Sequence, residues 1–277
     1  MEYCRLSNGM EMPMLGLGTF LTQGEECANS VCMAIRNGYR LIDTAEAYGN
    51  EEQVGNGIKR SGIDRKELFL VTKVNFRSYE KTEEVVNQSL KNLQTDYLDM
   101  VLLHWPFGNY YKAWQELEKI YEAGKIRAIG ISNFNPDRMI DLISFHKVKP
   151  VINQIETHLY CQRIKEHVWE EKYGVAHMAY APLGQGHLDA MFREETVKKL
   201  AIKYGKTVAQ ILLRFNIQNH VAVIPKSIRE EHIRENIDIF DFSLTEDEVK
   251  ELQALDKAAA IIGDPENPVK TEMAMTW

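Results

Sequence analysis

Short apolar runs alternate with longer amphipathic stretches along almost the whole chain. The runs have the length of β-strands, and the stretches repeat apolar residues every three or four positions, as a helix with one buried face does. We therefore predict alternating strands and helices. The predicted strands are Met14–Gly18, Arg40–Asp43, Leu68–Lys73, Leu98–His104, Ala128–Ser132, Val151–Gln154, Val175–Tyr180 and Val221–Pro225. The predicted helices are Glu25–Asn37, Glu51–Arg60, Thr82–Leu93, Tyr111–Ala123, Asp137–His146, Gln162–Tyr173, Glu194–Tyr204 and Glu231–Ile239.

The strand candidates are nearly all apolar, which indicates burial on both faces and therefore a parallel sheet. A repeated strand and helix unit allows a closed barrel or an open doubly wound sheet, and the count of eight units favours the barrel. Ahead of these units, Ser7-Asn8-Gly9 separates two short segments and is a hairpin signal. We predict an α/β fold with one domain over residues 1–277, a (β/α)8 TIM barrel with an N-terminal β-hairpin, and a poorly ordered tail over residues 260–277.

Several residues predict where helices begin and end. Asn50 is a candidate N-cap with Gln53 three residues later, and Asn135 precedes Pro136 at a first-turn position. Glycine follows four of the predicted helices, at Gly38, Gly124, Gly174 and Gly205.

Composition excludes several classes of protein. The 277 residues carry a net charge of -7 and contain no long run of Lys or Arg, which disfavours a nucleic-acid partner. No apolar segment has the length of a signal h-region or a membrane span, so we predict a cytoplasmic protein without a membrane partner. The four cysteines form no C-x-x-C pair and the histidines show no familiar ligand spacing, so we predict no metal site. We expect a monomer.

Polar side chains follow almost every predicted strand. In a (β/α)8 barrel the carboxyl ends of the strands meet at one mouth, where reactive residues gather. Each residue taken alone has an ordinary structural explanation, but a convergent set left without partners is costly to bury. The set is Asp43, Lys73, His104, Ser132, Asn133, Gln154, Tyr180, Lys226 and Ser227.

Three of these residues, Asp43, Lys73 and His104, form a predicted proton-donor group with the nearby Tyr48. The hydroxyl of Tyr48 has an ordinary pKa of about 10, and a neighbouring Lys73 cation is expected to lower that pKa by favouring the phenolate. Asp43 is placed to hold the Lys73 ammonium, and His104 to bond the substrate oxygen. Carbonyl reduction uses such a set, but so do enolisation and a Schiff base on Lys73, so these residues alone leave the reaction open.

The sequence lacks the glycine motif by which Rossmann domains bind a dinucleotide that supplies hydride. Gly16-Leu17-Gly18-Thr19-Phe20-Leu21 lacks the third glycine of G-x-G-x-x-G and follows a hairpin, so we exclude a Rossmann site. An anion site is predicted instead at Ile224-Pro225-Lys226-Ser227, with Arg229 nearby, because the last loops of a barrel often bind phosphate. The alternative is a solvated basic loop that binds nothing.

A longer motif joins two of the candidate residues. Gly38-Tyr39-Arg40-Leu41-Ile42-Asp43-Thr44-Ala45-Glu46-Ala47-Tyr48-Gly49-Asn50-Glu51 carries both Asp43 and Tyr48. With it come Val71-Thr72-Lys73, Leu103-His104-Trp105-Pro106, Gly124 to Phe134, Asn153-Gln154, Tyr180 to Gly184 and Ile224 to Ser227. In this order the segments resemble the aldo-keto reductase superfamily, from the hairpin to about Leu255. The segments after Trp105, Leu183 and Ala258 are short, as in bacterial diketogluconate-reductase-like or glyoxal-reductase-like members.

The resemblance implies reduction of an aldehyde or ketone, the partner being a small carbonyl compound, with NADP(H) in an extended pose. It implies that Tyr48 is the general acid, tuned by Lys73 and Asp43, and that His104 orients the carbonyl. Tyr180 would stack on the nicotinamide. The implied cofactor-binding set is Gly18, Thr19, Asp43, Ser132, Asn133, Gln154, Tyr180, Leu183, Lys226, Ser227, Arg229, His232, Glu235 and Asn236, and the implied substrate pocket is Phe20, Tyr48, His104 and Trp105.

One position departs from the family pattern. His232 stands where the family usually has an Arg that stacks on adenine and meets the 2′-phosphate. Arg229 is a candidate to replace the lost charge, so we expect NADPH and keep NADH as the alternative cofactor.

Two other functions remain open from the sequence. One is an NADP(H)-binding redox sensor or regulatory subunit with slow turnover. The other is a barrel lyase or aldolase that uses Lys73 as a Schiff base, against which the Lys226-Ser227 and Tyr180 matches argue.

Overall fold

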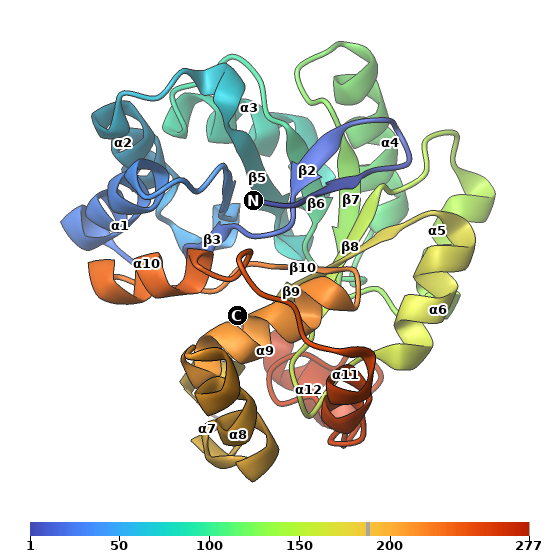
Figure 1. Cartoon of the computed structure of the whole chain (residues 1–277). Coiled ribbons are helices and arrows are strands. Elements are labelled where there is room, and N and C mark those ends of the chain that lie inside the picture. Colours follow the sequence, from blue (N-terminus) through green and yellow to red (C-terminus); the bar gives the residue numbers. More distant parts are fainter. Residues whose placement is uncertain (187–188, 277) are drawn as a thin grey trace.

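The parallel strands form a barrel with helices around its outside (Figure 1). The computed structural model describes residues 1–186 and 189–276. Within them, eight parallel strands form one sheet in the order β10-β9-β8-β7-β6-β5-β4-β3. Their bounds are β3 Leu17–Gly18, β4 Leu41–Asp43, β5 Phe69–Val74, β6 Met100–Leu103, β7 Ile129–Ser132, β8 Ile152–Glu156, β9 Ala176–Tyr180 and β10 Val221–Val223.

Backbone hydrogen bonds close the sheet into the predicted barrel. The amide of Gly16 donates to the carbonyl of Val223 over 2.9 Å, and the amide of Val223 donates to that of Met14 over 2.8 Å. Farther along, the amide of Gly18 donates to the carbonyl of Pro225 over 3.2 Å. The first and last strands therefore meet, and the (β/α)8 fold is confirmed. Each predicted strand overlaps an observed one, with boundaries that differ by up to three residues.

The helices that cover the barrel agree with the predicted ones to within about two residues at most ends. They are α1 Gly24–Arg36, α2 Glu51–Ser61, α3 Thr82–Asn92, α4 Tyr110–Glu122, α5 Pro136–Phe145, α6 Ile164–Tyr173, α8 Glu195–Tyr204 and α10 Glu230–Ile237. Short 3-10 helices are η1 Glu46–Tyr48, η2 Arg65–Glu67, η3 Phe76–Lys81 and η4 Gly184–Gly186. Among the described residues, no helix is both long and apolar enough to traverse a lipid bilayer.

Four helices were absent from the sequence prediction: α7 Asp189–Arg193, α9 Val208–Gln218, α11 Glu246–Gln253 and α12 Pro268–Ala274. Most of α9 is buried against β10 and neighbouring helices, so it lacks the polar face that marks an amphipathic stretch. A signal was present, because Thr207 with Gln210, and Thr245 with Glu248, form capping boxes that begin α9 and α11.

The predicted hairpin is confirmed as β1 (Tyr3–Arg5) paired antiparallel with β2 (Glu11–Pro13). The glycines predicted to follow helices all have positive φ, and Pro136 opens α5. The predicted side-chain cap by Asn50 is wrong, although its position before the helix is right. Asn50 precedes α2, but its amide donates to the carbonyls of Thr19 and Thr22 instead of capping the helix, because these buried carbonyls of the loop between β3 and α1 need donors.

Candidate functional site

Asp43, Lys73 and Tyr48 meet at the mouth of the barrel. Asp43 ends β4, Lys73 lies near the end of β5, and η1 presents Tyr48 between them in the chain. The Nζ atom of Lys73 lies 2.6 Å from Oδ1 of Asp43, 2.8 Å from the carbonyl oxygen of Thr44 and 3.4 Å from the hydroxyl of Tyr48. These three oxygens match the three hydrogens of an ammonium group. The side chains of Lys73 and Asp43 are almost fully buried, so each charge needs the opposite charge beside it to offset the cost of its burial.

The pKa of Tyr48 runs against the sequence prediction. Burial, and then the negative charge of Asp43, raise the pKa of Tyr48 well above its ordinary value. The predicted lowering fails because these two effects outweigh the influence of the Lys73 ammonium, which lies 3.4 Å from the hydroxyl. Tyr48 is therefore held as a protonated hydroxyl, which is the form that a general acid needs.

His104 follows β6 and faces Tyr48 across the mouth. The two ring centroids are 5.8 Å apart in an edge-on arrangement. Burial, with the charge of Lys73 second, lowers the pKa of His104 to about 3, so the imidazole is neutral at physiological pH. Its Nδ1 atom is buried without a hydrogen-bond partner among the described residues. A neutral imidazole beside a protonated phenol gives the mouth two uncharged groups suited to binding an oxygen atom.

Amide and hydroxyl side chains continue the set along the next three strands. Gln154 donates from Nε2 to Oδ2 of Asp43 over 2.8 Å, which links β8 to the proton-donor group. Asn133, in the left-handed region at φ 63°, donates to the carbonyl of His104 over 3.0 Å and accepts from the Tyr180 hydroxyl over 2.8 Å. Ser132 donates to the carbonyl of Gln154 over 2.8 Å. The structure therefore joins these predicted residues into one network.

The start of the chain supplies the opposite wall. Thr19 bonds the carbonyl of Asp43 through both its amide and its hydroxyl, each over 3.0 Å. A side chain at Gly18 would place Cβ 2.7 Å from the carbonyl oxygen of Ile224, so only glycine lets β3 approach the end of β10 this closely. Phe20 is exposed and packs on Tyr48 with ring centroids 4.9 Å apart.

Trp105 and Leu183 complete the predicted lining. The Trp105 ring is buried and stacks on Phe107 with centroids 5.5 Å apart, and it lies 6.5 Å from the ring of His104. Leu183 is half-buried and packs against the apolar core beside Tyr180. The aromatic side chains predicted for the substrate pocket thus surround Tyr48 and His104.

The residues after β10 that are predicted to bind the cofactor form a separate cluster. Lys226 is exposed, while Ser227 is buried and accepts the amide hydrogen of Arg229 over 3.1 Å. The guanidinium of Arg229 contacts both ring nitrogens of His232. Glu235 and the buried Asn236 lie in the last turn of α10. Two acidic residues in the first turn of α10, Glu230 and Glu231, oppose the positive charge of this cluster.

Sequence reasoning missed the contact between β8 and the segment after residue 260. Glu156, fully buried at the end of β8, accepts the backbone N–H groups of Ile261, Ile262 and Gly263 over 2.7, 2.8 and 2.7 Å. Burial alone would raise the pKa of Glu156, but bonds from His158 and from these amides hold it below its ordinary value. Arg163 adds a bond to the carbonyl of Gly263 over 3.0 Å. Glu156 follows the predicted Gln154 by two positions, which was the available signal.

These bonds place the backbone of Gly263 against the mouth. A Cβ at this position would lie 2.1 Å from the Tyr180 hydroxyl oxygen and 3.1 Å from Oδ1 of Asn133. The predicted disorder of residues 260–277 stays a prediction, but helix α12 lies within this segment.

We expect Gly263→Ala to raise the KM for a carbonyl substrate about fivefold, because the added methyl group displaces the segment from Tyr180. Steady-state kinetics measure this effect. Ala259→Gly is the control, since residue 259 is exposed and bonds Tyr160 only through its backbone. An unchanged KM in Gly263→Ala would show that the segment does not border the substrate.

Comparison with known proteins shows which family has this sequence and fold. The family model described as the aldo/keto reductase family matches residues 14–257. Glyoxal reductase of Bacillus subtilis is 44% identical over 266 residues, which cover 95% of each chain. Methylglyoxal reductase DkgA of Escherichia coli is 39% identical over 265 residues, covering 95% of this chain and 96% of that protein.

A solved structure agrees in fold. The Bombyx mori aldo-keto reductase in complex with NADP has a TM-score of 0.90 and 34% identity, with 96% of each chain covered. The matched region contains every strand of the barrel and the complete proton-donor group. This chain belongs to the aldo/keto reductase family and is an oxidoreductase.

Proposed function

We propose that this chain reduces small aldehydes, and above all α-oxoaldehydes such as glyoxal and methylglyoxal, with NADPH, and that Tyr48 is the general acid. The observation that carries the proposal is the buried group in which Lys73 Nζ lies 2.6 Å from Asp43 and 3.4 Å from the Tyr48 hydroxyl. We also propose that a single chain suffices, because the whole set of side chains comes from one barrel.

The residues at the mouth fit a nicotinamide cofactor. Hydroxyl and amide side chains at the ends of β7 and β8, from Ser132, Asn133 and Gln154, are suited to a carboxamide. Lys226 and Arg229, exposed after β10, offer positive charge for phosphates. When bound, the reduced nicotinamide supplies the hydride for the carbonyl carbon.

The protein's own residues bind and protonate the carbonyl oxygen of the substrate. Negative charge develops on the carbonyl oxygen as the carbon is reduced, and the protonated Tyr48 hydroxyl donates its proton there. The nearby Lys73 ammonium stabilises the phenolate that remains, while Asp43 fixes the ammonium. The neutral His104 binds the same oxygen by hydrogen bonding and sets its direction.

The substrate class rests on two observations. Relatives at 44% and 39% identity are named glyoxal reductase and methylglyoxal reductase. Phe20 packs on Tyr48 and Trp105 lies beside His104, so the site divides between aromatic rings and the polar groups that would bind the reacting oxygen. A short dicarbonyl compound fits this division, because its reacting carbonyl is also activated by the neighbouring one.

A panel of carbonyl compounds with NADPH tests this proposal. We expect kcat/KM for methylglyoxal to exceed that for propanal by at least tenfold, as followed by the loss of NADPH absorbance. Equal values for both compounds would contradict the dicarbonyl preference, and no oxidation of NADPH with any carbonyl would contradict the reductase function itself.

We expect Arg229→Ala to raise the KM for NADPH about tenfold and that for NADH less than twofold. The reason is that a charged hydrogen bond to the 2′-phosphate contributes roughly 1.5–3 kcal/mol, and only NADPH carries this phosphate. Arg193→Ala on α7 removes an exposed arginine elsewhere and serves as the control. Equal increases for both cofactors would remove Arg229 from the 2′-phosphate site.

A further inference from the structure

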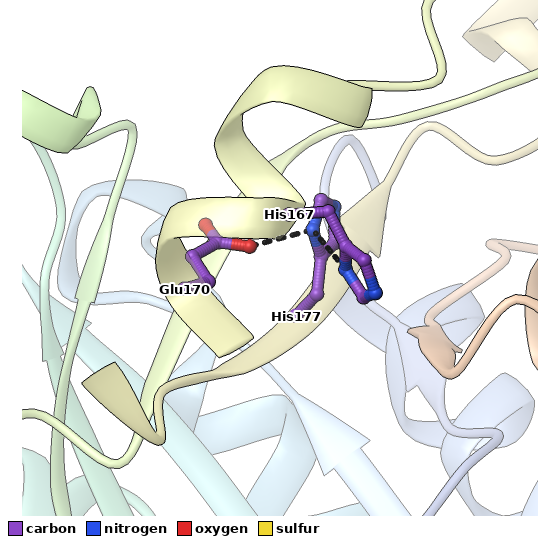
Figure 2. A group of neighbouring side chains, drawn as sticks. All are labelled: His167, Glu170 and His177. Carbon is purple, nitrogen blue, oxygen red and sulfur yellow. Dashed lines mark hydrogen bonds and ion pairs between the residues drawn. The ribbon is translucent and has the colours of Figure 1, made fainter. Parts of the chain in front are cut away.

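Two histidines and a glutamate converge on the outer face of the barrel wall, away from the mouth. Inside the barrel, Gln154 of β8 meets Met178 of β9, with Nε2 and Sδ 3.0 Å apart. Side chains alternate along a strand, so His177, one residue before Met178, points outward to the helix layer. There α6 presents His167 and Glu170, three positions apart and therefore on one helix face. Figure 2 shows the three side chains directed at one another.

The three ligand atoms have separations close to those of a metal site. Oε2 of Glu170 lies 2.7 Å from Nδ1 of His177, and Nδ1 of His167 lies 3.3 Å from the same nitrogen. All three atoms lie within 4.8 Å of one another. A tetrahedral zinc ion with bonds of about 2.0–2.1 Å keeps its ligand atoms about 3.3 Å apart. Side-chain movements of about 1.5 Å or less would place all three on one ion.

The other polar atoms of the buried ligands are already held. Nδ2 of Asn153 donates to Oε1 of Glu170 over 2.7 Å, and the Thr157 hydroxyl lies 2.8 Å from Nε2 of His177. Metal ligands are oriented in this way, with the second nitrogen of a histidine and the second oxygen of a carboxylate bonded to neighbours. The atoms that these bonds leave over are Oε2 and Nδ1, which face each other.

One of these atoms is left without a proper partner. Glu170 is 1% exposed, and among the described residues its Oε2 accepts no bond of hydrogen-bond geometry, despite its short distance to His177. Burying such an oxygen unsatisfied destabilises a fold, whereas a cation satisfies it. His167 is only half-buried, so the cluster is reachable from solvent.

We propose that His167, Glu170 and His177 bind a divalent transition-metal ion of the zinc type, which joins α6 to β9 on the outside of the barrel. Two imidazole nitrogens and one carboxylate oxygen favour zinc over calcium or magnesium, which prefer oxygen ligands alone. A fourth position remains for water. From the sequence we predict no metal site, and this set leaves no motif in it because its residues follow no familiar spacing and come from a helix and the next strand.

Zinc binding by the chelator-treated full chain tests the proposal. Calorimetric titration with ZnCl2 is expected to show one ion per chain, and His167→Gln is expected to weaken Kd at least tenfold. His167 is half-buried, and the bonds of Asn153 and Thr157 do not involve it, so this variant is expected to fold. His146→Gln, which removes a half-buried histidine on another helix end, is the matched control and is expected to leave Kd unchanged.

Two further measurements separate a built site from surface binding. At a free zinc concentration 100 times the wild-type Kd, we expect Tm to rise by about 5 °C in the wild type and by about half of that or less in His167→Gln. Thr157→Val is expected to weaken Kd about tenfold by releasing Nε2 of His177. Zinc affinity that is the same in wild type, His167→Gln and Glu170→Gln would overturn the proposal, as would an equal loss in the His146→Gln control.

Discussion

Tyr48→Phe is expected to lower kcat for a carbonyl substrate about 1,000-fold and to leave the affinity for NADPH within about twofold. The variant removes the hydroxyl that lies 3.4 Å from Lys73 Nζ and keeps the ring that packs on Phe20. A positioned general acid contributes roughly 100- to 10,000-fold to a rate. Single-turnover kinetics measure the chemical step, and quenching of protein fluorescence by NADPH measures the affinity.

Tyr111→Phe is the control for this experiment, because Tyr111 bonds Asp141 on the outer helices and lies outside the proton-donor group. We expect its kcat to equal that of the wild type. If Tyr48→Phe kept full turnover, the proton would have to come from another group, and His104 would be the first candidate.

Lys73→Met is expected to lower kcat at least 100-fold and to reduce the free energy of unfolding by about 3–5 kcal/mol. Removing one partner of a buried ion pair leaves the other charge uncompensated, and among the described residues the Asp43 carboxylate would keep only the bond from Gln154. The phenolate of Tyr48 would also lose the ammonium that stabilises it. Urea unfolding followed by circular dichroism measures the stability, and steady-state kinetics measure the rate.

The double variant Asp43→Asn with Lys73→Met separates the two effects. It removes both charges, so we expect it to recover most of the lost stability while its kcat stays low. Recovery of activity along with stability would mean that Lys73 serves only to keep the site folded.

The barrel could be predicted because its signal is local. Each strand is a short apolar run with a polar residue at its end, and each covering helix carries an apolar stripe. The helix α9 escaped prediction because tertiary burial on most of its surface erased that stripe. Asn50 was misjudged for a related reason, since its amide serves backbone carbonyls more than twenty positions away.

In the candidate site, too, some features could be predicted from the sequence and others could not. Strand order brings Asp43, Lys73 and His104 together, so their proximity follows from the topology alone. The pKa of Tyr48 does not, because it depends on how deeply the phenol is buried and on its distance from the negative charge of Asp43. Contacts that join distant segments, such as Glu156 with residues 261–263, leave no periodic mark in the sequence.

Transfer of deuterium tests the central claim most directly. The chain is incubated with methylglyoxal and NADPH deuterated at the transferable position of C4, and the alcohol product is analysed by mass spectrometry. We predict one deuterium per product molecule in the wild type and at least 100-fold less product from Tyr48→Phe in the same time. Product formed without deuterium, or formed equally fast by the variant, would contradict hydride transfer with Tyr48 as the proton donor.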